Sequence, residues 1–482
     1  MNNRAIIGVS AAAILVIGYV AASWGLGRAV HSGFDAWEQQ TATQPLPMLK
    51  IVERRHTPGV FSSVEDVTFE FNSAIFDQFE QKRRQEQQRA GGDDEDAAEE
   101  PTNKPPVRFT VRNDIKHGPL PGFTGIGMGR IDSKLLWTAD ARKELDQFLP
   151  GREPVEISTL LGLLGGSSSH VTSPAFDFKD ENTTVAWKGF ESDFSVGRNL
   201  GSIGCNATAP GLSLYDADGT GAKFEALKLT CDGDRVFDEF YNGTVNLEIA
   251  NVEGRTRDGT PMRMQKFSYA SDVRAEGEYL NMAAKVGVGA LDFLQYDLSE
   301  IKYHLSLRHL HGPTYAALMR KMQSSAMSSA AGDPAASLAL AGAFGEFGPQ
   351  LLEHSPQIVI DHIGFKAPEG EFGINGTVEL ADFKKDDLAT PQGRTALMTK
   401  VVANADVWIS EGLLNKDWSG TTAAEPTDVR AQETPGPSKV EALRQQVAAF
   451  EQQGFVTRKD GQIRSHIEFK GGALTANGKP LQ

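Results

Sequence analysis

Apolar and polar residues alternate with a period of two in many short segments of this chain. In the segment VEDVTFEF, Val67, Phe69 and Phe71 share one parity, whereas Thr68 and Glu70 have the other. This period is typical of a β-strand that buries one face and exposes the other to water. A chain built mostly from such segments must form sheets, because an isolated strand leaves its backbone groups without hydrogen bonds.

Segments of this kind recur along the chain, and turn signals such as DADG, DGD, EG and NG separate many of them. They include VRFTVRNDI, TVAWKGF, GLSLYDA, KFEALKLTC, TVNLEIANV, IKYHLSLRHL, PQIVIDHIGF and FGINGTVEL. The pattern predicts a strand-dominated α+β fold, with an extended antiparallel β-sheet body and a few packed helices. NGTVNLEI at Asn242 and NGTVEL at Asn375 each read as an Asn-Gly turn followed by a strand.

Two segments carry helix signals. GPTYAALMRKM has Pro313 near a first helical position, and VEALRQQVAAFEQQG ends on Gly454, a typical C-cap. The second segment places Val440, Leu443, Val447 and Phe450 on one helical stripe. TALMTKVVANADVWIS fits either a helix or a strand, and the terminal SHIEFKGGALTANGKPLQ predicts a closing hairpin.

The N-terminus predicts a membrane anchor. Residues 5–24 form a run of twenty residues without a charge, and a helix of about that length spans the ~30 Å hydrocarbon layer. Tyr19 and Trp24 suit the membrane interface, and Arg4 favours a cytoplasmic tail. The alternative is a signal peptide cleaved near Val20-Ala21-Ala22, but the apolar run is longer than the usual apolar h-region of about 7–15 residues in a signal peptide. We therefore expect one N-terminal transmembrane helix.

Composition limits the partners. The formal net charge is −15, and nucleic-acid binding relies on clustered Lys and Arg, so we expect no nucleic-acid partner. The two cysteines, Cys205 and Cys231, are candidates for a disulfide if the body lies in an oxidising compartment. Such a bridge would stabilise the fold by about 3 kcal/mol. The alternative is two buried free thiols.

The chain divides by composition into several regions. They are a cytoplasmic tail at 1–4, the anchor at 5–24, an N-terminal β-rich region at 25–310 with a disordered acidic loop at about 88–106, and a C-terminal β-rich region with helices at 311–482 with a linker at about 419–438.

Candidate sites for chemistry are few. The stretch IKHGPLPGFTGIGMGR has glycines in GxGxG spacing and no helix signal after them, so a strand-terminating turn at His117, Gly118 and Pro119 explains it better than a phosphate loop. His309 and His311 would share a strand face, but a metal would need a third ligand such as His354 or His362. His304 lies near them in sequence. The spacing matches no strong zinc pattern, so we assign no metal, cofactor or catalytic residue.

Several motifs together resemble the YdgA family of Gram-negative envelope proteins, whose domain has no known function. The specific ones are GVFSS at 59–63, HGP at 117–119 and NGKP at 477–480, and the likeness covers nearly the whole chain. The resemblance implies an inner-membrane anchor with the body in the periplasm. It implies no catalytic residue, and it favours a structural role for HGP.

We therefore expect a non-enzymatic, inner-membrane-anchored periplasmic protein of unknown activity that binds lipid or another envelope molecule along its sheet. An envelope scaffold that binds other proteins is the alternative, and a hydrolase with dispersed catalytic residues is a further one.

Overall fold

The computed structural model describes residues 49–71, 108–147, 149–181, 183–237, 240–256, 259–294, 296–330, 335–388, 391–416 and 439–481. The predicted anchor, the acidic loop at 88–106 and the linker at 419–438 lie outside these ranges. No helix in the described ranges is both long enough and apolar enough to cross a bilayer.

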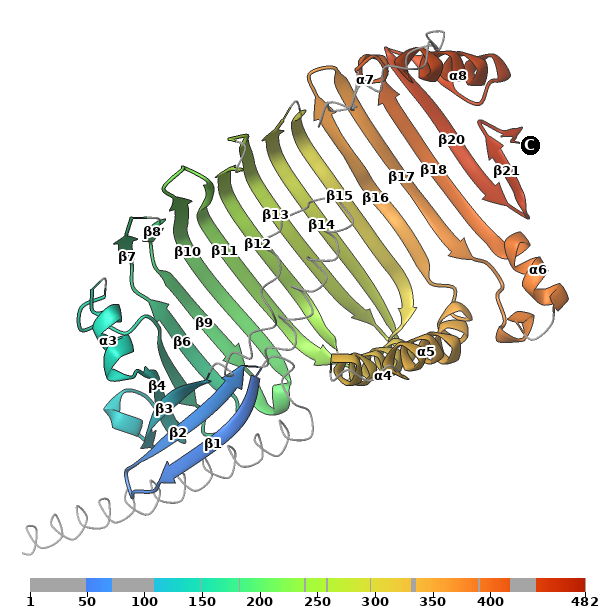
Figure 1. The fold of residues 1–482 in the computed structure, drawn as a ribbon. Coiled ribbons are helices and arrows are strands. Elements are labelled where there is room, and N and C mark those ends of the chain that lie inside the picture. The colour runs from blue at the N-terminus through green and yellow to red at the C-terminus, as the bar shows by residue number, and fades with distance from the viewer. Residues whose placement is uncertain are drawn as a thin grey trace, which may run out of the picture. The chain divides into compact units, whose positions relative to one another are not determined.

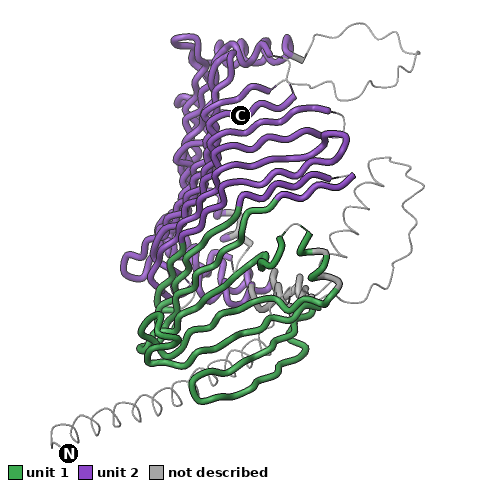
Figure 2. Tube along the Cα trace, turned by 90° about the vertical axis from the view of Figure 1, so that its left-hand side faces the viewer, with its two compact units in different colours: residues 1–176, 189–205, 326–336 green, residues 177–188, 206–325, 337–482 purple. Residues whose placement is uncertain are grey.

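The structure confirms a strand-dominated antiparallel fold with few helices, as Figure 1 shows. It divides into two compact units (Figure 2). Unit 1 comprises residues 1–176, 189–205 and 326–336, and unit 2 comprises residues 177–188, 206–325 and 337–482. The division that the sequence predicts at residue 310 stays a prediction.

Unit 1 is an antiparallel sheet in which each strand pairs with its successor. In order, the strands are β1 (Leu49–Thr57), β2 (Ser62–Phe71), β3 (Arg108–His117), β4 (Gly129–Leu136), β5 (Glu156–Leu161), β6 (Ser167–Ser173) and β9 (Phe190–Val196). The 3-10 turn η2 (Pro121–Phe123) follows β3, and helix α3 (Ala139–Leu145) follows β4. Ile115 and Ile131 face each other on β3 and β4 and form its small core.

Unit 2 is a longer antiparallel meander. Its long strands are most of β10 (Ser202–Asp216), then β11 (Gly221–Val236), β12 (Phe240–Arg255), β13 (Pro261–Glu276), β14 (Tyr279–Phe293), β15 (Tyr296–His311), β16 (Gln357–Ala367), β17 (Gly370–Leu380), β18 (Val401–Ser410) and β20 (Gln462–Lys470). Its short strands are β8 (Thr183–Trp187), β19 (Thr457–Lys459), β21 (Ala473–Ala476) and β22 (Lys479–Pro480), and β7 (Phe176–Lys179) starts at the boundary.

The helices of this meander are α4 (Gly312–Ala330), most of which belongs to unit 2, α5 (Ala335–Leu352), α6 (Pro391–Lys400), α7 (Glu411–Leu414) and α8 (Lys439–Gln453), with 3-10 turn η4 (Lys385–Leu388). The predictions of α4, α8 and the closing hairpin of β20 and β21 are confirmed. The ambiguous segment TALMTKVVANADVWIS is divided, with a helix up to Lys400 and a strand from Val401.

Helices α4 and α5 cover only one end of the unit 2 sheet. Leu280 and Leu310 of the sheet are buried against Leu318 of α4 and Leu351 of α5. At the edge of this core, Ile358 of β16 lies opposite Leu307 and remains 53% exposed. Apolar positions on neighbouring strands are directly paired in register, which gives this sheet face an apolar character well beyond the helix-covered end.

Two Asn-Gly pairs that the sequence marks as turns lie inside strands instead, so that prediction is wrong. Gly243 lies in β12 and Gly376 lies in β17. A Cβ atom at Gly243 would lie 2.0 Å from the carbonyl oxygen of Asp232 on β11. Close approach of a neighbouring strand therefore explains this glycine better than a turn does.

Candidate functional site: an apolar groove across β10 to β13

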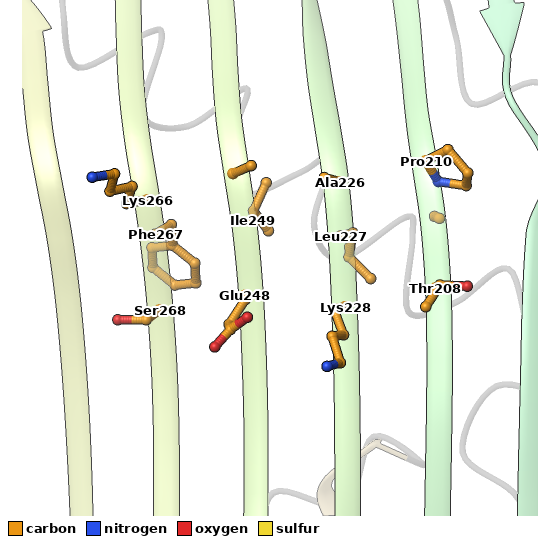
Figure 3. A pocket seen from close by; sticks show the side chains of 12 residues that line it. Thr208, Pro210, Ala226, Leu227, Lys228, Glu248, Ile249, Lys266, Phe267 and Ser268 are labelled. Carbon is orange, nitrogen blue, oxygen red and sulfur yellow. The ribbon is translucent and has the colours of Figure 1, made fainter.

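A groove of about 670 Å³ crosses four neighbouring strands of unit 2. Leu227 on β11, Ile249 on β12 and Phe267 on β13 pair directly with one another in register, so their side chains lie on the same face of the sheet (Figure 3). Ala209 and Pro210 of β10 complete the apolar part of the lining. This volume falls within the range of about 300–1,000 Å³ that small-molecule sites occupy.

The groove lies at a line of left-handed backbone that crosses the sheet. Ala226 of β11 has φ 55° and Lys266 of β13 has φ 53°, and the register places them on either side of Ala250 of β12. Glu300 of β15 continues the line with φ 46°, opposite Gly289 of β14. Because an extended strand cannot continue straight through a left-handed residue, the strands change direction at this level.

This backbone is strained at non-glycine positions. The left-handed conformation costs roughly 1–2 kcal/mol for an ordinary residue. Strain of this kind gathers at binding sites, where the surrounding fold maintains it. Ala226, Ala250 and Lys266 all line the groove, so the line of bends and the groove are one feature.

Polar groups complete the lining of the groove. They are Thr208, Lys228, Glu248, Lys266 and Ser268. The lining contains no histidine or cysteine and a single carboxylate, so it offers neither a nucleophile–base pair nor a pair of carboxylates. Its apolar row beside charged side chains suits the binding of an apolar group next to a charge.

A second cleft, in unit 1, is polar. It has a volume of about 440 Å³ and contains Asp132, Glu156 and His170 among its lining residues. Burial works to raise the pKa of Asp132, but hydrogen bonds from Lys116, Arg130 and Ser158 outweigh it and hold that pKa below its ordinary value. A general acid needs a carboxyl with a raised pKa, so Asp132 itself does not fit that role.

The family-motif turn at His117, Gly118 and Pro119 is buried at one end of unit 1. His117 is 5% exposed and lies between the carbonyl of Val60 and the hydroxyl of Ser63. Since a carbonyl only accepts, Nδ1 of His117 donates to Val60, and Nε2 accepts from Ser63. The Gly118–Pro119 peptide bond is cis. The side chain of His117 therefore ties the β1–β2 connection to the end of β3.

The structure brings three of the predicted histidines together. The rings of His311 and His354 stack with their centroids 3.9 Å apart, and Tyr279 stacks on His309 at the same distance. Nδ1 of His309 donates to the carbonyl of His354. No cluster of at least three His, Cys, Asp or Glu residues in the described ranges could hold a metal ion.

The second histidine pair lies further along the same sheet. His304 and His362 face each other on β15 and β16, with ring centroids 6.4 Å apart. Burial, with the positive charges of Lys285, His362 and Lys302, lowers the pKa of His304. His304 and His362 therefore pack against each other as a pair across β15 and β16.

No free cysteine is present among the described residues. The bridge between Cys205 and Cys231 stays a prediction with its own test.

Comparison with known proteins decides the family. The family model for bacterial proteins of unknown function, DUF945, matches residues 1–482. The chain belongs to the DUF945 family. It is also 20% identical over 388 residues to Protein YdgA of Escherichia coli (strain K12), and this match covers 76% of each of the two chains.

The DUF945 match confirms the resemblance that the sequence motifs carry. No solved structure matches the chain. Two of the three specific motifs, GVFSS and HGP, meet in the structure through Ser63 and His117. The third places Asn477 in a turn, where its side chain donates to the carbonyl of Phe455 and accepts from the backbone of His466. The motifs of this DUF945 member thus fix its ends and turns.

Proposed function

We propose that this protein is a non-enzymatic component of the bacterial envelope that binds the acyl chain of a lipid in the groove across β10 to β13. The apolar row of Leu227, Ile249 and Phe267, half-buried and lining a groove of about 670 Å³, carries the proposal. Burying an acyl chain there would remove apolar surface of both partners from water, at roughly 25 cal/mol for each Å².

The charges beside the row favour a lipid with an anionic head group. Lys228 and Lys266 line the groove next to Leu227 and Phe267 (Figure 3). Glu248 lies opposite Lys228 in register, so the two lysines leave one positive charge in excess. A lysine ammonium binds phosphate as a point charge. An apolar stripe with adjacent cations matches the amphipathic structure of a phospholipid.

The proposal also includes a location. The uncharged run at residues 5–24 would hold the protein in the inner membrane by a single span, with the body in the periplasm. In that place the groove would have a supply of acyl chains nearby.

Photo-crosslinking tests the groove directly. Cells that produce the full chain are fed a fatty acid with a diazirine on its acyl chain, irradiated, and the labelled peptides are mapped by mass spectrometry. We expect label on β11 to β13, and its loss in Phe267→Asp. Phe194→Asp is the control, because Phe194 is 42% exposed on β9, outside the groove.

Two results would reject the proposal. Label confined to residues 5–24 would show a membrane anchor without a lipid site. Label on β11 to β13 that Phe267→Asp leaves unchanged would show contact of the sheet with membrane, not occupancy of the groove.

A further inference from the structure

Four loops of unit 1 lie at the same end of its sheet. The register aligns His117, Gly129, Leu161, Ser167 and Val196 in one row across β3, β4, β5, β6 and β9. The loops that leave this row are residues 118–128, 162–166 and 197–201, and the turn at 58–61 joins them beside His117, whose amide donates to the carbonyl of Phe61.

These loops expose large apolar side chains to solvent. Phe123 is 82% exposed, Ile126 is 68% exposed and Leu164 is 85% exposed. The apolar tip surface, as we name it, consists of these three residues with Phe61, Leu120 and Leu163. Soluble proteins rarely expose apolar side chains that are grouped in this way, and such groups mark interaction sites.

The composition of the loops is as unusual as their exposure. Residues 58–61, 118–128, 162–166 and 197–201 contain no acidic residue, and Arg198 is their one charged residue. The whole chain has 63 acidic and 48 basic residues. Turns are ordinarily rich in polar and charged residues, so the absence of acids from all four loops sets this end apart from the rest of the chain.

The tips are held in place by backbone hydrogen bonds. Gly118 donates to the carbonyl of Met128, and Met128 donates to that of Leu161, which ties neighbouring loops together. Beneath them, His117 is fixed by Val60 and Ser63. The apolar side chains are therefore presented on an ordered base, so little conformational entropy is lost when they bind.

We propose that the apolar tip surface inserts into the interfacial layer of a lipid bilayer. Three features favour a bilayer over a protein partner. The apolar residues are at loop tips rather than on a flat face, acids that anionic lipids would repel are absent, and Arg198 adds a cation that such lipids attract.

The chain can reach a bilayer in this way. Between the apolar run that ends at Trp24 and the start of β1 at Leu49 lie residues 25–48. At about 3.3–3.6 Å for each residue this connection extends up to roughly 80 Å. The tips lie one β1 length, about 30 Å, beyond Leu49, so a chain anchored by residues 5–24 could place its tips on the same membrane.

Tryptophan quenching in the full chain tests this surface locally. Phe123→Trp and Leu164→Trp are reconstituted into vesicles of phosphatidylcholine and phosphatidylglycerol with bromine on the upper part of the acyl chains. The signal of the parent chain, with its six tryptophans, is subtracted. We expect the added fluorescence to lose most of its intensity, and Leu136→Trp at the opposite end of β4 to keep it.

Each other outcome would overturn the proposal. If the fluorescence added by Phe123→Trp and by Leu164→Trp is equally intense in brominated and plain lipid, the tips stay in water. A blue shift that follows protein concentration without lipid would assign the surface to a second copy of the chain. The groove test maps label on β11 to β13, so the two proposals succeed or fail independently.

Discussion

Oγ of Ser63 lies 3.0 Å from Nε2 of His117, and both side chains are buried. The two residues come from separate motifs, 54 positions apart, and the contact joins β2 to the end of β3. A serine hydroxyl beside an imidazole is also the geometry of a nucleophile and its base. Here Nδ1 of His117 donates to a main-chain carbonyl rather than to a carboxylate, so the pair secures a turn.

Replacement of His117 should therefore destabilise the protein. His117→Ala leaves a cavity and deprives both Ser63 and the Val60 carbonyl of a partner, which should cost about 2–4 kcal/mol. Urea unfolding of the full chain measures the loss. His170→Ala is the control, because the His170 side chain is 48% exposed beside Asp193, and its loss should change stability by less than about 1 kcal/mol.

A double-mutant cycle separates the contact from the cavity. Ser63→Ala, His117→Ala and the double variant should give a coupling of about 1 kcal/mol. A coupling near zero would show that the two side chains stabilise the turn separately.

A lower pH should weaken the fold through His354. Burial, with the positive charges of His311 and His309, lowers the pKa of His354 below its ordinary value of 6.5, although Glu353 and Glu278 act in the opposite direction. The unfolded chain then binds the proton more readily than the folded one, so the free energy of unfolding rises with pH in this window. Stability should be full above pH 6.5 and should decline as the pH falls below it.

The measurement is urea unfolding between about pH 7.5 and 5.5. His354→Gln should flatten the pH dependence relative to the parent, while the remaining slope reports His304, whose pKa is also lowered. An unchanged slope in His354→Gln would contradict the assignment.

At the line of left-handed residues, we expect a substitution to stabilise the protein rather than destabilise it. Lys266 is left-handed at φ 53°, and glycine adopts that conformation at no steric cost. Lys266→Gly should therefore stabilise the protein or leave it unchanged, whereas the same substitution in an extended strand costs roughly 1 kcal/mol. Lys285→Gly, within β14, is the matched control. Equal losses for the two variants would mean that Lys266 is not strained.

The sequence predicts strands well because their signal is local. Val67, Phe69 and Phe71 alternate with polar residues as a half-buried strand requires, and all three lie in β2. Gly454 ends α8 with φ 76°, as its position in the sequence predicts. These features depend on neighbours a few residues away, which the sequence displays directly.

The bends could not be predicted, because Ala226 and Lys266 are left-handed although alanine and lysine rarely adopt that conformation, so nothing in the local sequence signals it. The groove was missed for the same reason. At Gly243 the sequence predicted a turn that the structure does not contain. The glycine there allows the close approach of β11. The apolar loops did leave a signal in the sequence: LGLLGG has two leucines in a turn without any charge.

The cysteines provide the last prediction. If Cys205 and Cys231 are bridged, the intact full chain should bind no thiol reagent after denaturation, and reduction should expose two thiols with a mass gain of two hydrogens. Loss of the bridge in Cys205→Ser should cost about 3 kcal/mol by the chain-entropy estimate, and Cys231→Ser should cost the same, because each removes one bond. The double variant should be no less stable than either single one, since a bond is lost only once. Additive losses would instead mean that each thiol stabilises its own strand by packing, and two reactive thiols in the unreduced chain would show that the bridge does not form.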